Sequence, residues 1–508
     1  MCRKSRQFSD HFTLMNVAKT KKLNRTDLLL EKVRTSADSM SRREQIELTV
    51  LLAIPAILAQ LSHIVMEYID ASMVGRLGAV DSAAIGLVAT TTWLFWGLGS
   101  AVGTGFSVQV AHRIGACDSA GARQVLRQAF VVALSVGLLF SLVAVSISGK
   151  LPYWLGGTDE ICSGATRYFF VFALTLPVFL LVHMMSSMLR CSGNVKVPSA
   201  LNVLMCALDV LFNFLLIFPS RTVNLGAVSL QIPGAGLGVL GAALGTMFAE
   251  IVTGALLFYF LCFRSLHLSL FGRLKHEVQT WRDFRPTERV LRKAVKIGMP
   301  IGCERVIMCG AQICSTMIVA PLGMFAIAAN SFGINAESLC YMPGYGIADA
   351  ATTLVGQSIG AQQKDLAKRF ARITVTMGVA VMTLMGVLMY VAAPVMMGIM
   401  TPVPEIVSLG VSALRIEAFA EPMFAASIVC YGVFVGAGDT LIPSSMNLGA
   451  IWAFRITLAF ALAPVMGLNG VWLAMCIELN LRGIMFLWRL KSGRWIPKNL
   501  RMQEQKIQ

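Results

Sequence analysis

Long apolar stretches recur along this chain between residues 48 and 490, and each is about 20 residues or longer. A helix of that length crosses roughly 30 Å of hydrocarbon, where only helices and closed barrels satisfy the hydrogen bonds of the backbone. The 508-residue chain is 56% hydrophobic and 14% charged, whereas soluble domains carry about 25% charged residues. The sequence therefore predicts an all-α polytopic membrane protein that folds as one large bundle.

Twelve of these stretches are predicted to be transmembrane helices. They are residues 48–74, 83–107, 126–147, 164–187, 195–218, 236–262, 295–318, 326–352, 371–393, 408–432, 442–464 and 470–489. Lys, Arg and His gather in loops 108–125, 188–194, 263–294 and 353–370, and the alternate loops hold few of them. Because cytoplasmic loops carry an excess of Lys and Arg, we expect a multi-pass protein of the cell (inner) membrane with both termini in the cytoplasm.

The two halves of the chain repeat one another. The segment "AVGTGFSVQVAHRIGACDSAGARQ" (101–124) aligns with "GIADAATTLVGQSIGAQQKDLAKR" (346–369) at a shift of 245 residues, and the same shift pairs Pro55 with Pro300. With six spans in each half, both halves enter the membrane from the same side, so they are parallel repeats about an axis along the membrane normal. We expect two six-helix lobes that enclose a central cavity and expose it alternately to each side.

The charged segments outside the spans complete the predicted organisation. It consists of a basic cytoplasmic tail (1–47), a first lobe (48–262), a basic cytoplasmic linker (263–294), a second lobe (295–490) and a basic cytoplasmic tail (491–508). The net charge of +16 therefore follows membrane topology, and we expect no nucleic-acid partner. Met40 opens a lead-in of more usual length, "MSRREQIELTVLLAIP", so the first 39 residues are either a disordered tail or precede the true start.

Several motifs in these spans resemble one transporter family. They are "MVGRLG" after an aspartate in the first span, "CSGNVKVP" and "GAGDTLIP" before spans five and eleven, "GAALGTMFAE" in span six and "LVGQSIGA" after span eight. Over residues 48–490 the chain resembles the MATE (multidrug and toxic compound extrusion) transporters, and "MPIGCERV" (299–306) resembles the DinF-like branch more than the NorM branch.

The resemblance carries definite expectations about function. It implies twelve helices in two lobes and a secondary active antiporter, not an enzyme, that exports cationic or amphiphilic organic compounds in exchange for H⁺ or Na⁺. The expected partners are those small molecules and membrane lipid, with no cofactor beyond the coupling ion, and the expected state is a monomer. No GxxxxGK[ST] phosphate loop is present, which agrees with secondary transport.

The candidate ion-coupling residues lie in the first lobe. Asp70 ends the first span, where a carboxylate is costly unless it has a partner, a water-filled cavity or a function. The resemblance makes it the coupling carboxylate, and the alternatives are a solvated helix-end residue or a partner of Arg76. Asp209 and Asn213 share one face of span five, and Thr246 of span six matches a hydroxyl position of the same cluster in similar transporters. Those transporters have Asn before Asp in span five, so the charge here is displaced by one turn, roughly 5.4 Å.

Other polar residues of the spans are candidates for the cavity or the substrate site. They are Gln60, Glu67, Glu250 and Asp349. An equally open alternative for Glu250 is a helix-end pair with a loop arginine. His63 and Glu67 share a helix face with Asp70, but one helix with no second cluster is a weak metal site, and the twelve scattered cysteines form no C-x-x-C pair. We therefore predict no metal.

The second lobe carries further acids, among them Glu304, Glu417 and Glu421. We expect Glu304 to pair with the adjacent Arg305 near the cytoplasmic end of span seven. The NorM branch uses second-lobe acids for its cation, but at the corresponding place in span seven this chain has Met308.

Alternative functions fit the sequence less well. A flippase for a lipid-linked sugar or polysaccharide precursor is the main alternative, and its cavity is expected to be strongly basic, whereas these spans carry acids. A membrane enzyme acting on lipid is expected to show a cluster of His, Asp or Arg at one membrane face, and none is evident. A channel would not require the two-lobe repeat.

Overall fold

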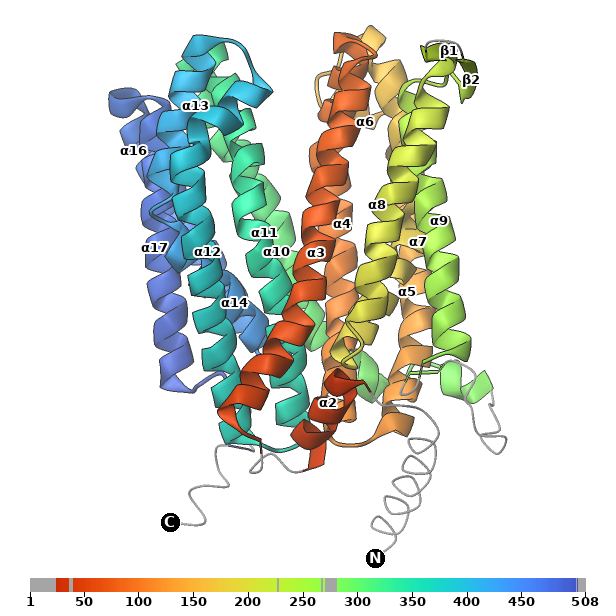
Figure 1. Cartoon of the computed structure of the whole chain (residues 1–508), viewed down its shortest axis with the longest axis vertical. Coiled ribbons are helices and arrows are strands. Elements are labelled where there is room, and N and C mark those ends of the chain that lie inside the picture. The colour runs from red at the N-terminus through yellow and green to blue at the C-terminus, as the bar shows by residue number, and fades with distance from the viewer. Residues whose placement is uncertain are drawn as a thin grey trace, which may run out of the picture.

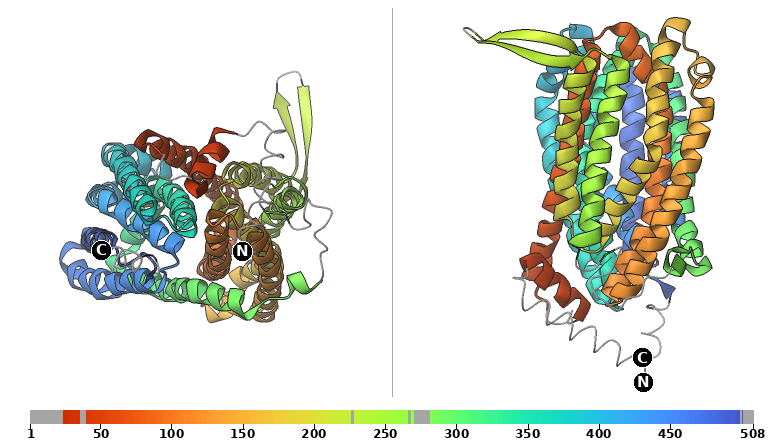
Figure 2. Two further views of the ribbon diagram at one scale, coloured as in Figure 1. Left: turned by 90° about the horizontal axis from the view of Figure 1, so that it is seen from below. Right: turned by 90° about the vertical axis from the view of Figure 1, so that its right-hand side faces the viewer.

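The computed structural model describes residues 24–35, 40–225, 228–265, 268–269, 281–498 and 500. Most of the predicted N-terminal tail, part of the linker and the end of the C-terminal tail lie outside these residues. The described chain forms two helical lobes that lie side by side (Figures 1 and 2).

Each lobe is built from one half of the chain. The N-terminal lobe contains α3 (Arg42–Gly75), α4 (Ala79–Gly115), α5 (Ser119–Ile147), the short α6 (Leu151–Trp154), α7 (Asp159–Cys191), α8 (Lys196–Ile217) and α9 (Val239–Phe263). The C-terminal lobe contains α10 (Glu288–Val319), α11 (Met324–Gly360), α12 (Lys364–Met400), α13 (Pro404–Glu417), α14 (Glu421–Ala437), α15 (Leu441–Ala450), the π-helical turn η4 (Ile451–Ile456), α16 (Thr457–Met466) and α17 (Leu468–Ser492). Two short 3₁₀ turns, η2 (Trp281–Phe284) and η3 (Ala320–Leu322), precede and follow α10.

These helices account for twelve membrane crossings within the described residues. Ten runs are long and apolar enough to span a bilayer, and α13 with α14 forms an eleventh as a bent pair. The twelfth is α11, whose 37 residues run the height of the bundle beside α10 (Figure 1). The predicted all-α fold with two lobes of six spans is therefore confirmed.

One predicted span is broken in the structure. The sequence predicts a continuous helix over 408–432, but α13 and α14 meet at a 60° bend after Glu417. Pro422 lies in the first turn of α14; a proline has no N–H to donate and its ring clashes with the carbonyl four residues earlier. Its repeat partner Pro177 lies inside the continuous helix α7, so the proline alone does not determine the break.

The long loop expected at 219–238 contains a β-hairpin. Strand β1 (Pro219–Leu225) pairs antiparallel with β2 (Val228–Ala235), with an irregularity in register between Pro219 and Arg221. The hairpin projects from the end of the bundle opposite the short helix α2 (Arg25–Thr35), as Figure 2 shows.

The lobes meet where α4 and α11 cross, and the contact follows the internal repeat. A Cβ on Gly115 would lie 2.0 Å from the carbonyl oxygen of Gln357, and a Cβ on Gly360 would lie 2.2 Å from that of His112. The shift of 245 residues relates Gly115 to Gly360 and His112 to Gln357. The same backbone contact is thus made twice, as expected for parallel repeats related by a two-fold axis through the crossing.

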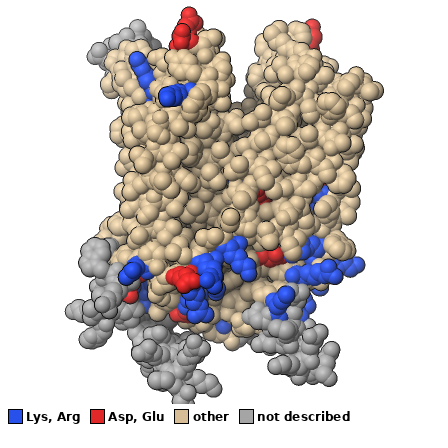
Figure 3. All heavy atoms as spheres, turned by 180° about the vertical axis from the view of Figure 1, so that it is seen from behind, with Lys and Arg blue, Asp and Glu red and all other residues tan. Residues whose placement is uncertain are grey.

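The lobes separate toward the hairpin end. The space-filling view shows a hollow between them at that end, while Lys and Arg form a band near the opposite end (Figure 3). The glycine contacts between α4 and α11 lie at the C-terminal ends of those helices. The structure is therefore closed at the basic end and open at the other.

The helix α2 lies in the segment expected to be a tail. Its side chains Leu29, Leu30 and Val33 are buried. Arg34 donates from Nε to Oε1 of Gln357 (3.3 Å) and from an Nη atom to the carbonyl of Ser192 (3.2 Å). Because Ser192 follows α7 and Gln357 belongs to α11, α2 contacts both lobes at their closed end.

We predict that Leu30→Ala releases α2 from the bundle. Leu30 packs against Gly193, and the loss of a buried leucine costs on the order of 2 to 5 kcal/mol; a helix of 11 residues does not persist alone in water. Trypsin should then cleave after Arg34 several-fold faster than in the wild type. Leu28→Ala, at a side chain that is 44% exposed, is the control and should change nothing. Equal cleavage of the Leu30 variant and the wild type would contradict the docking.

Candidate functional site

Three of the four predicted ion-coupling residues form one hydrogen-bonded cluster. The side-chain nitrogen of Asn213 donates to Oδ1 of Asp70 (2.9 Å) and to Oδ2 of Asp209 (3.0 Å). Asp209 and Asn213 are 0% and 1% exposed, and Asp70 is half-buried. An amide NH₂ has two hydrogens, so Asn213 holds both carboxylates at once.

The helices explain why these side chains meet. Asp209 and Asn213 are one turn apart on α8, and α3 packs along α8 and brings Asp70 to the same level. The predicted alternative partner, Arg76, is exposed, and no ion pair joins it to Asp70 in the described chain. The reversed order of Asp and Asn in span five therefore still brings an amide between two carboxylates.

The fourth predicted residue, Thr246, borders the cluster from α9. Its hydroxyl donates to the carbonyl of Ala242 (3.3 Å), and the side chain also interacts with the carboxylate of Asp209. The neighbouring Gly245 lies directly against the amide of Asn213: a Cβ there would be 2.0 Å from Oδ1 of Asn213. The close approach of α9 and α8 thus depends on this glycine.

The cluster has spare acceptor atoms. Oδ1 of Asp209 and Oδ1 of Asn213 are buried and have no hydrogen-bond partner. Two carboxylates that share a poorly hydrated pocket repel each other when both are ionised. A proton on Asp209, or a small cation between the spare oxygens, would relieve that repulsion.

The four residues predicted for the cavity fall into two groups. Gln60 and Asp349 line a central cavity between the lobes. Glu67 and Glu250 do not line it: Oε1 of Glu67 lies 3.6 Å from Nδ1 of His63, and Glu250 is buried in α9 with Oε2 unpartnered. No ion pair of Glu250 with a loop arginine occurs in the described residues, so the helix-end pairing considered for it is not made.

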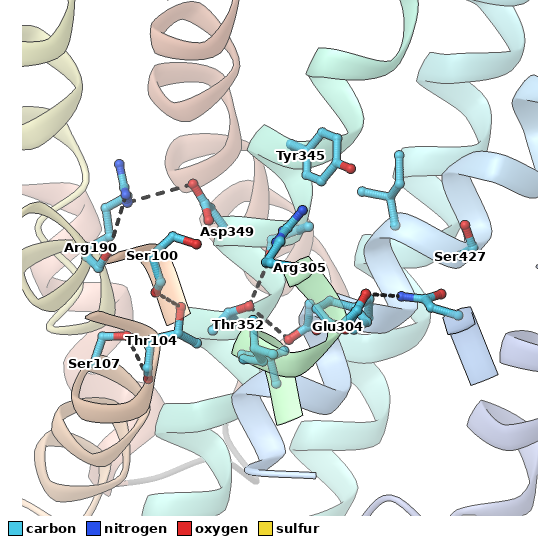
Figure 4. A pocket seen from close by; sticks show the side chains of 18 of the residues that line it. Ser100, Thr104, Ser107, Arg190, Glu304, Arg305, Tyr345, Asp349, Thr352 and Ser427 are labelled. Carbon is cyan, nitrogen blue, oxygen red and sulfur yellow. Dashed lines mark hydrogen bonds and ion pairs between the residues drawn. The ribbon is translucent and has the colours of Figure 1, made fainter. Parts of the chain in front are cut away.

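The central cavity has a volume of about 220 Å³ and is lined by both lobes (Figure 4). Its polar and aromatic lining includes Gln60, Ser100, Thr104, Arg190, Glu304, Arg305, Tyr345, Asp349, Phe424, Tyr431, Asn447 and Arg482. The ion cluster of Asp70, Asp209 and Asn213 is a separate site, because none of its three residues lines this cavity.

Glu304 differs from its expected role. It makes no ion pair with Arg305 in the described structure; its carboxylate accepts hydrogen bonds from the hydroxyl of Tyr431 (2.7 Å) and from Nδ2 of Asn447 (2.8 Å). Neighbouring residues on a helix point about 100° apart, so sequence adjacency does not bring the two side chains together. Glu304 is a cavity residue, and the prediction of an ion pair was wrong.

The internal repeat could have located this contact. Asn202, which the 245-residue shift relates to Asn447, donates to the carbonyl of Ala59 (3.0 Å), and the same shift relates Ala59 to Glu304. Each lobe thus places an asparagine against the same position of its first helix. In the second lobe that position carries a carboxylate.

An ion pair crosses the cavity from one lobe to the other. Nε of Arg190 on α7 lies 3.7 Å from Oδ2 of Asp349 on α11 (Figure 4). Arg305 also lines the cavity, and its Nε is buried with no hydrogen-bond partner. The cavity therefore offers two carboxylates, three guanidinium groups and several aromatic rings, and motion of one lobe against the other would stretch the Arg190–Asp349 pair.

We predict that Gly245→Ala disrupts the ion cluster. The added methyl group overlaps the amide of Asn213, and overpacking of this kind costs about 1 to 3 kcal/mol. The purified variant should melt at a lower temperature in detergent than the wild type. Gly86→Ala in α4, where a Cβ meets no atom within 4 Å, is the control and should match the wild type. A Gly245 variant with wild-type melting would show that α9 does not hold Asn213 in place.

The sequence of this chain is similar to those of known proteins. A family model described as MatE matches residues 55–215 and 300–461, one segment in each lobe. The probable multidrug resistance protein NorM of Thermotoga maritima is 23% identical over 449 residues, which cover 88% of this chain and 92% of that protein. The multidrug resistance protein PmpM of Pseudomonas aeruginosa is 23% identical over 476 residues, which cover 91% of this chain and 95% of that protein.

A solved structure shares the fold. It is described as the outward-facing conformation of a multidrug resistance MATE family transporter of the MOP superfamily, and it superposes with a TM-score of 0.81 over 92% of this chain and 98% of that chain, at 21% identity. Because the MatE model matches more than half of the residues, once in each lobe, this chain belongs to the MATE family of transporters.

Proposed function

We propose that this chain is a secondary active antiporter that exports cationic or amphiphilic organic compounds in exchange for H⁺ or Na⁺. One observation carries the proposal: a single buried amide, Asn213, bridges two carboxylates in the first lobe of a two-lobe transporter fold. Asp70, Asp209, Asn213 and Thr246 are proposed as the ion-coupling residues, with no other cofactor.

The proposed coupling step begins when the charge on the cluster of Asp70, Asp209 and Asn213 changes. A proton taken up by the carboxylate of Asp209, or Na⁺ held by the spare oxygens of Asp209 and Asn213, relieves the repulsion between Asp209 and Asp70. Helix α3 can respond by bending at Pro55, which lacks one backbone hydrogen bond. The same helix packs tightly against the second lobe, because a Cβ on Gly346 of α11 would lie 2.7 Å from the backbone nitrogen of Ile57. A change in α3 therefore reaches the lobe interface directly.

The proposed substrate site is the central cavity. Asp349 and Glu304 offer carboxylates to a cationic group, and Tyr345 and Phe424 offer aromatic faces, which attract cations. A cation bound at Asp349 would compete with Arg190 for that carboxylate and so weaken an ion pair between the lobes. Gln60 places α3 in the same cavity, which links it to the coupling helix.

The proposal also includes the membrane that holds the protein and the orientation of the protein in it. We place the basic end of the molecule (Figure 3) in the cytoplasm, because cytoplasmic loops carry an excess of Lys and Arg. Both tails and the linker then face the cytoplasm of a cell whose inner membrane holds the protein as a monomer, and the cavity opens outward. Membership of the DinF-like branch stays a prediction that rests on "MPIGCERV".

The flippase alternative is less well supported. A cavity that binds a lipid-linked sugar phosphate is expected to be strongly basic, and this cavity contains Glu304 and Asp349 beside its arginines. The relatives NorM and PmpM are named as multidrug resistance proteins. We therefore advance no second function.

We predict that Asp70→Asn abolishes gradient-driven export. Cells that produce the wild-type protein should accumulate less ethidium than cells without it, and collapse of both the H⁺ and Na⁺ gradients should remove the difference. Cells with Asp70→Asn should accumulate as much ethidium as cells without the protein, although the variant inserts and melts normally, because an amide does not take up the coupling ion. Asp159→Asn, at an exposed carboxylate at the start of α7, is the control. Normal export by Asp70→Asn would make Asp70 only a helix-end residue.

We predict that the order of Asp and Asn in α8 can be exchanged in part. Asp209→Asn alone should remove nearly all export, since one of the two carboxylates that Asn213 bridges is lost. Asp209→Asn combined with Asn213→Asp restores a carboxylate next to Asp70 and an amide one turn away, and should recover part of the export. The measurement is the initial rate of ethidium efflux. If the double variant exports no better than Asp209→Asn, the two positions are not interchangeable.

A further inference from the structure

The charged side chains of the central cavity do not all have a counter-charge. They are Arg190, Glu304, Arg305, Asp349 and Arg482. Nε of Arg190 lies 3.7 Å from Oδ2 of Asp349, and Nε of Arg482 lies 3.2 Å from Oε1 of Glu478, which does not line the cavity. Glu304 and Arg305 are the two remaining charges, and no ion pair joins them in the described residues.

The internal repeat explains why Glu304 and Arg305 do not meet. The 245-residue shift relates them to Ala59 and Gln60 of α3. Ala59, through its carbonyl, and Glu304, through its carboxylate, each accept a hydrogen bond from an asparagine of their own lobe. Gln60 and Arg305 both line the central cavity. The first position of each pair therefore contacts its own lobe, and the second faces the cavity.

The side chain of Arg305 is packed against the opposite lobe. A Cβ on Gly97 of α4 would lie 3.0 Å from Cγ of Arg305 and 3.2 Å from its Cδ, so the aliphatic part of the arginine contacts the first lobe. Figure 4 shows Arg305 pointing toward the level of Tyr345, whereas Glu304 points in another direction. The packing of its aliphatic part thus positions the guanidinium, which has five N–H donors.

The guanidinium of Arg305 has no partner in the described structure. Its Nε is buried without a hydrogen-bond acceptor, and no carboxylate of the described residues forms an ion pair with it. The charges of Arg305 and Arg190 both act on the imidazole of His183 on α7, so an anion beside Arg305 also experiences the charge of Arg190. An unpaired charge that is partly removed from water is costly, and an oxyanion of a ligand would supply the missing partner.

We propose that Arg305 binds a carboxylate of the exported compound, so that the preferred substrates are zwitterions, amphiphiles with a carboxylate as well as a cationic group. The planar fork of a guanidinium matches the two oxygens of a carboxylate and forms charge-assisted hydrogen bonds with them. The cationic group of the same molecule uses the acidic and aromatic side chains that the proposed function already assigns to it. This inference rests on the proposed export function and specifies a substrate class within it.

The repeat also gives the substrate an orientation in the cavity. At equivalent positions the first lobe offers the neutral amide of Gln60 and the second lobe offers the guanidinium of Arg305, which is always charged. The carboxylate of a zwitterion is therefore directed toward α10. Arg305→Gln places at this position the residue that the first lobe has at the equivalent one, so we expect this variant to fold.

Binding of two matched dyes to the purified protein tests the inference. Rhodamine B carries a carboxylate and a delocalised cation at neutral pH, and its ethyl ester carries only the cation. The two dissociation constants are measured by fluorescence anisotropy in detergent. The wild type should bind rhodamine B about tenfold more tightly than the ester, because charge-assisted hydrogen bonds contribute at least this much. In Arg305→Gln the ratio of the two constants should fall to about one.

Two variants serve as controls. Arg305→Lys keeps the charge but loses the planar fork, so it should retain part of the preference for rhodamine B. Arg289→Gln removes an exposed arginine of the same helix that does not line the cavity, and it should match the wild type. Equal binding of the acid and the ester by the wild type, binding of neither dye, or an unchanged preference in Arg305→Gln overturns the proposal.

A lipid phosphate is another oxyanion that could reach Arg305 in a membrane protein. The binding measurement is therefore repeated in the presence of phosphatidylglycerol, and the ratio of the two dissociation constants should not change. If phosphatidylglycerol displaces rhodamine B but not its ester, Arg305 binds a lipid headgroup and the proposed substrate class is wrong.

Transport in sealed vesicles separates this inference from the proposed function. If the wild type prefers rhodamine B and Arg305→Gln does not, but no imposed ion gradient drives export, the antiport proposal fails and the carboxylate site stands. If an ion gradient drives export of ethidium while the acid and the ester bind equally, the carboxylate site fails alone.

Discussion

The cost of a buried charge determines how this structure is organised. Hydrocarbon provides no water to hydrogen-bond a carboxylate, so each acid inside the bundle has to find a donor, an opposite charge or a proton. Asp70 and Asp209 share the amide of Asn213, Glu304 accepts from Tyr431 and Asn447, and Asp349 faces Arg190. These three ways of stabilising a buried carboxylate have different consequences. The shared amide leaves two oxygens without a partner, the Tyr–Asn pair fixes Glu304 in the cavity wall, and the Arg190–Asp349 pair joins the two lobes.

The internal repeat provides the frame on which these charges are placed. Backbone contacts obey the repeat closely, as the paired approaches of Gly115 to Gln357 and of Gly360 to His112 show. The acids buried in the first helices and in the broken span of the second lobe do not obey it. Ala59 is replaced by Glu304, and Phe172 and Leu176 are replaced by Glu417 and Glu421. One scaffold therefore appears twice, while each lobe holds its own acids.

The sequence predicted the fold well because its signals are strong and local. Span lengths, loop charges and a constant shift of 245 residues each have a direct physical meaning, and they yielded the twelve spans and the two lobes. It also predicted which polar residues of α3 and α8 would meet. It failed where the outcome depends on contacts between distant segments: the docking of α2 through Leu29 and Leu30, the break before Pro422, and the partner of Glu304. Among the buried acids of the second lobe, the sequence pointed to Glu417 and Glu421, but Glu337 and Glu478 were missed, because they come from separate helices, α11 and α17.

The central claim is that an ion gradient, acting on carboxylates inside the lobes, drives export. The most direct test uses purified protein in sealed vesicles without ATP, with a proton gradient or a Na⁺ gradient imposed one at a time while ethidium is followed. The account predicts that ethidium moves against its own gradient when at least one of the two gradients is imposed in the direction that lets the ion exchange for it. Movement only down the ethidium gradient, whichever ion gradient is imposed, would contradict the account.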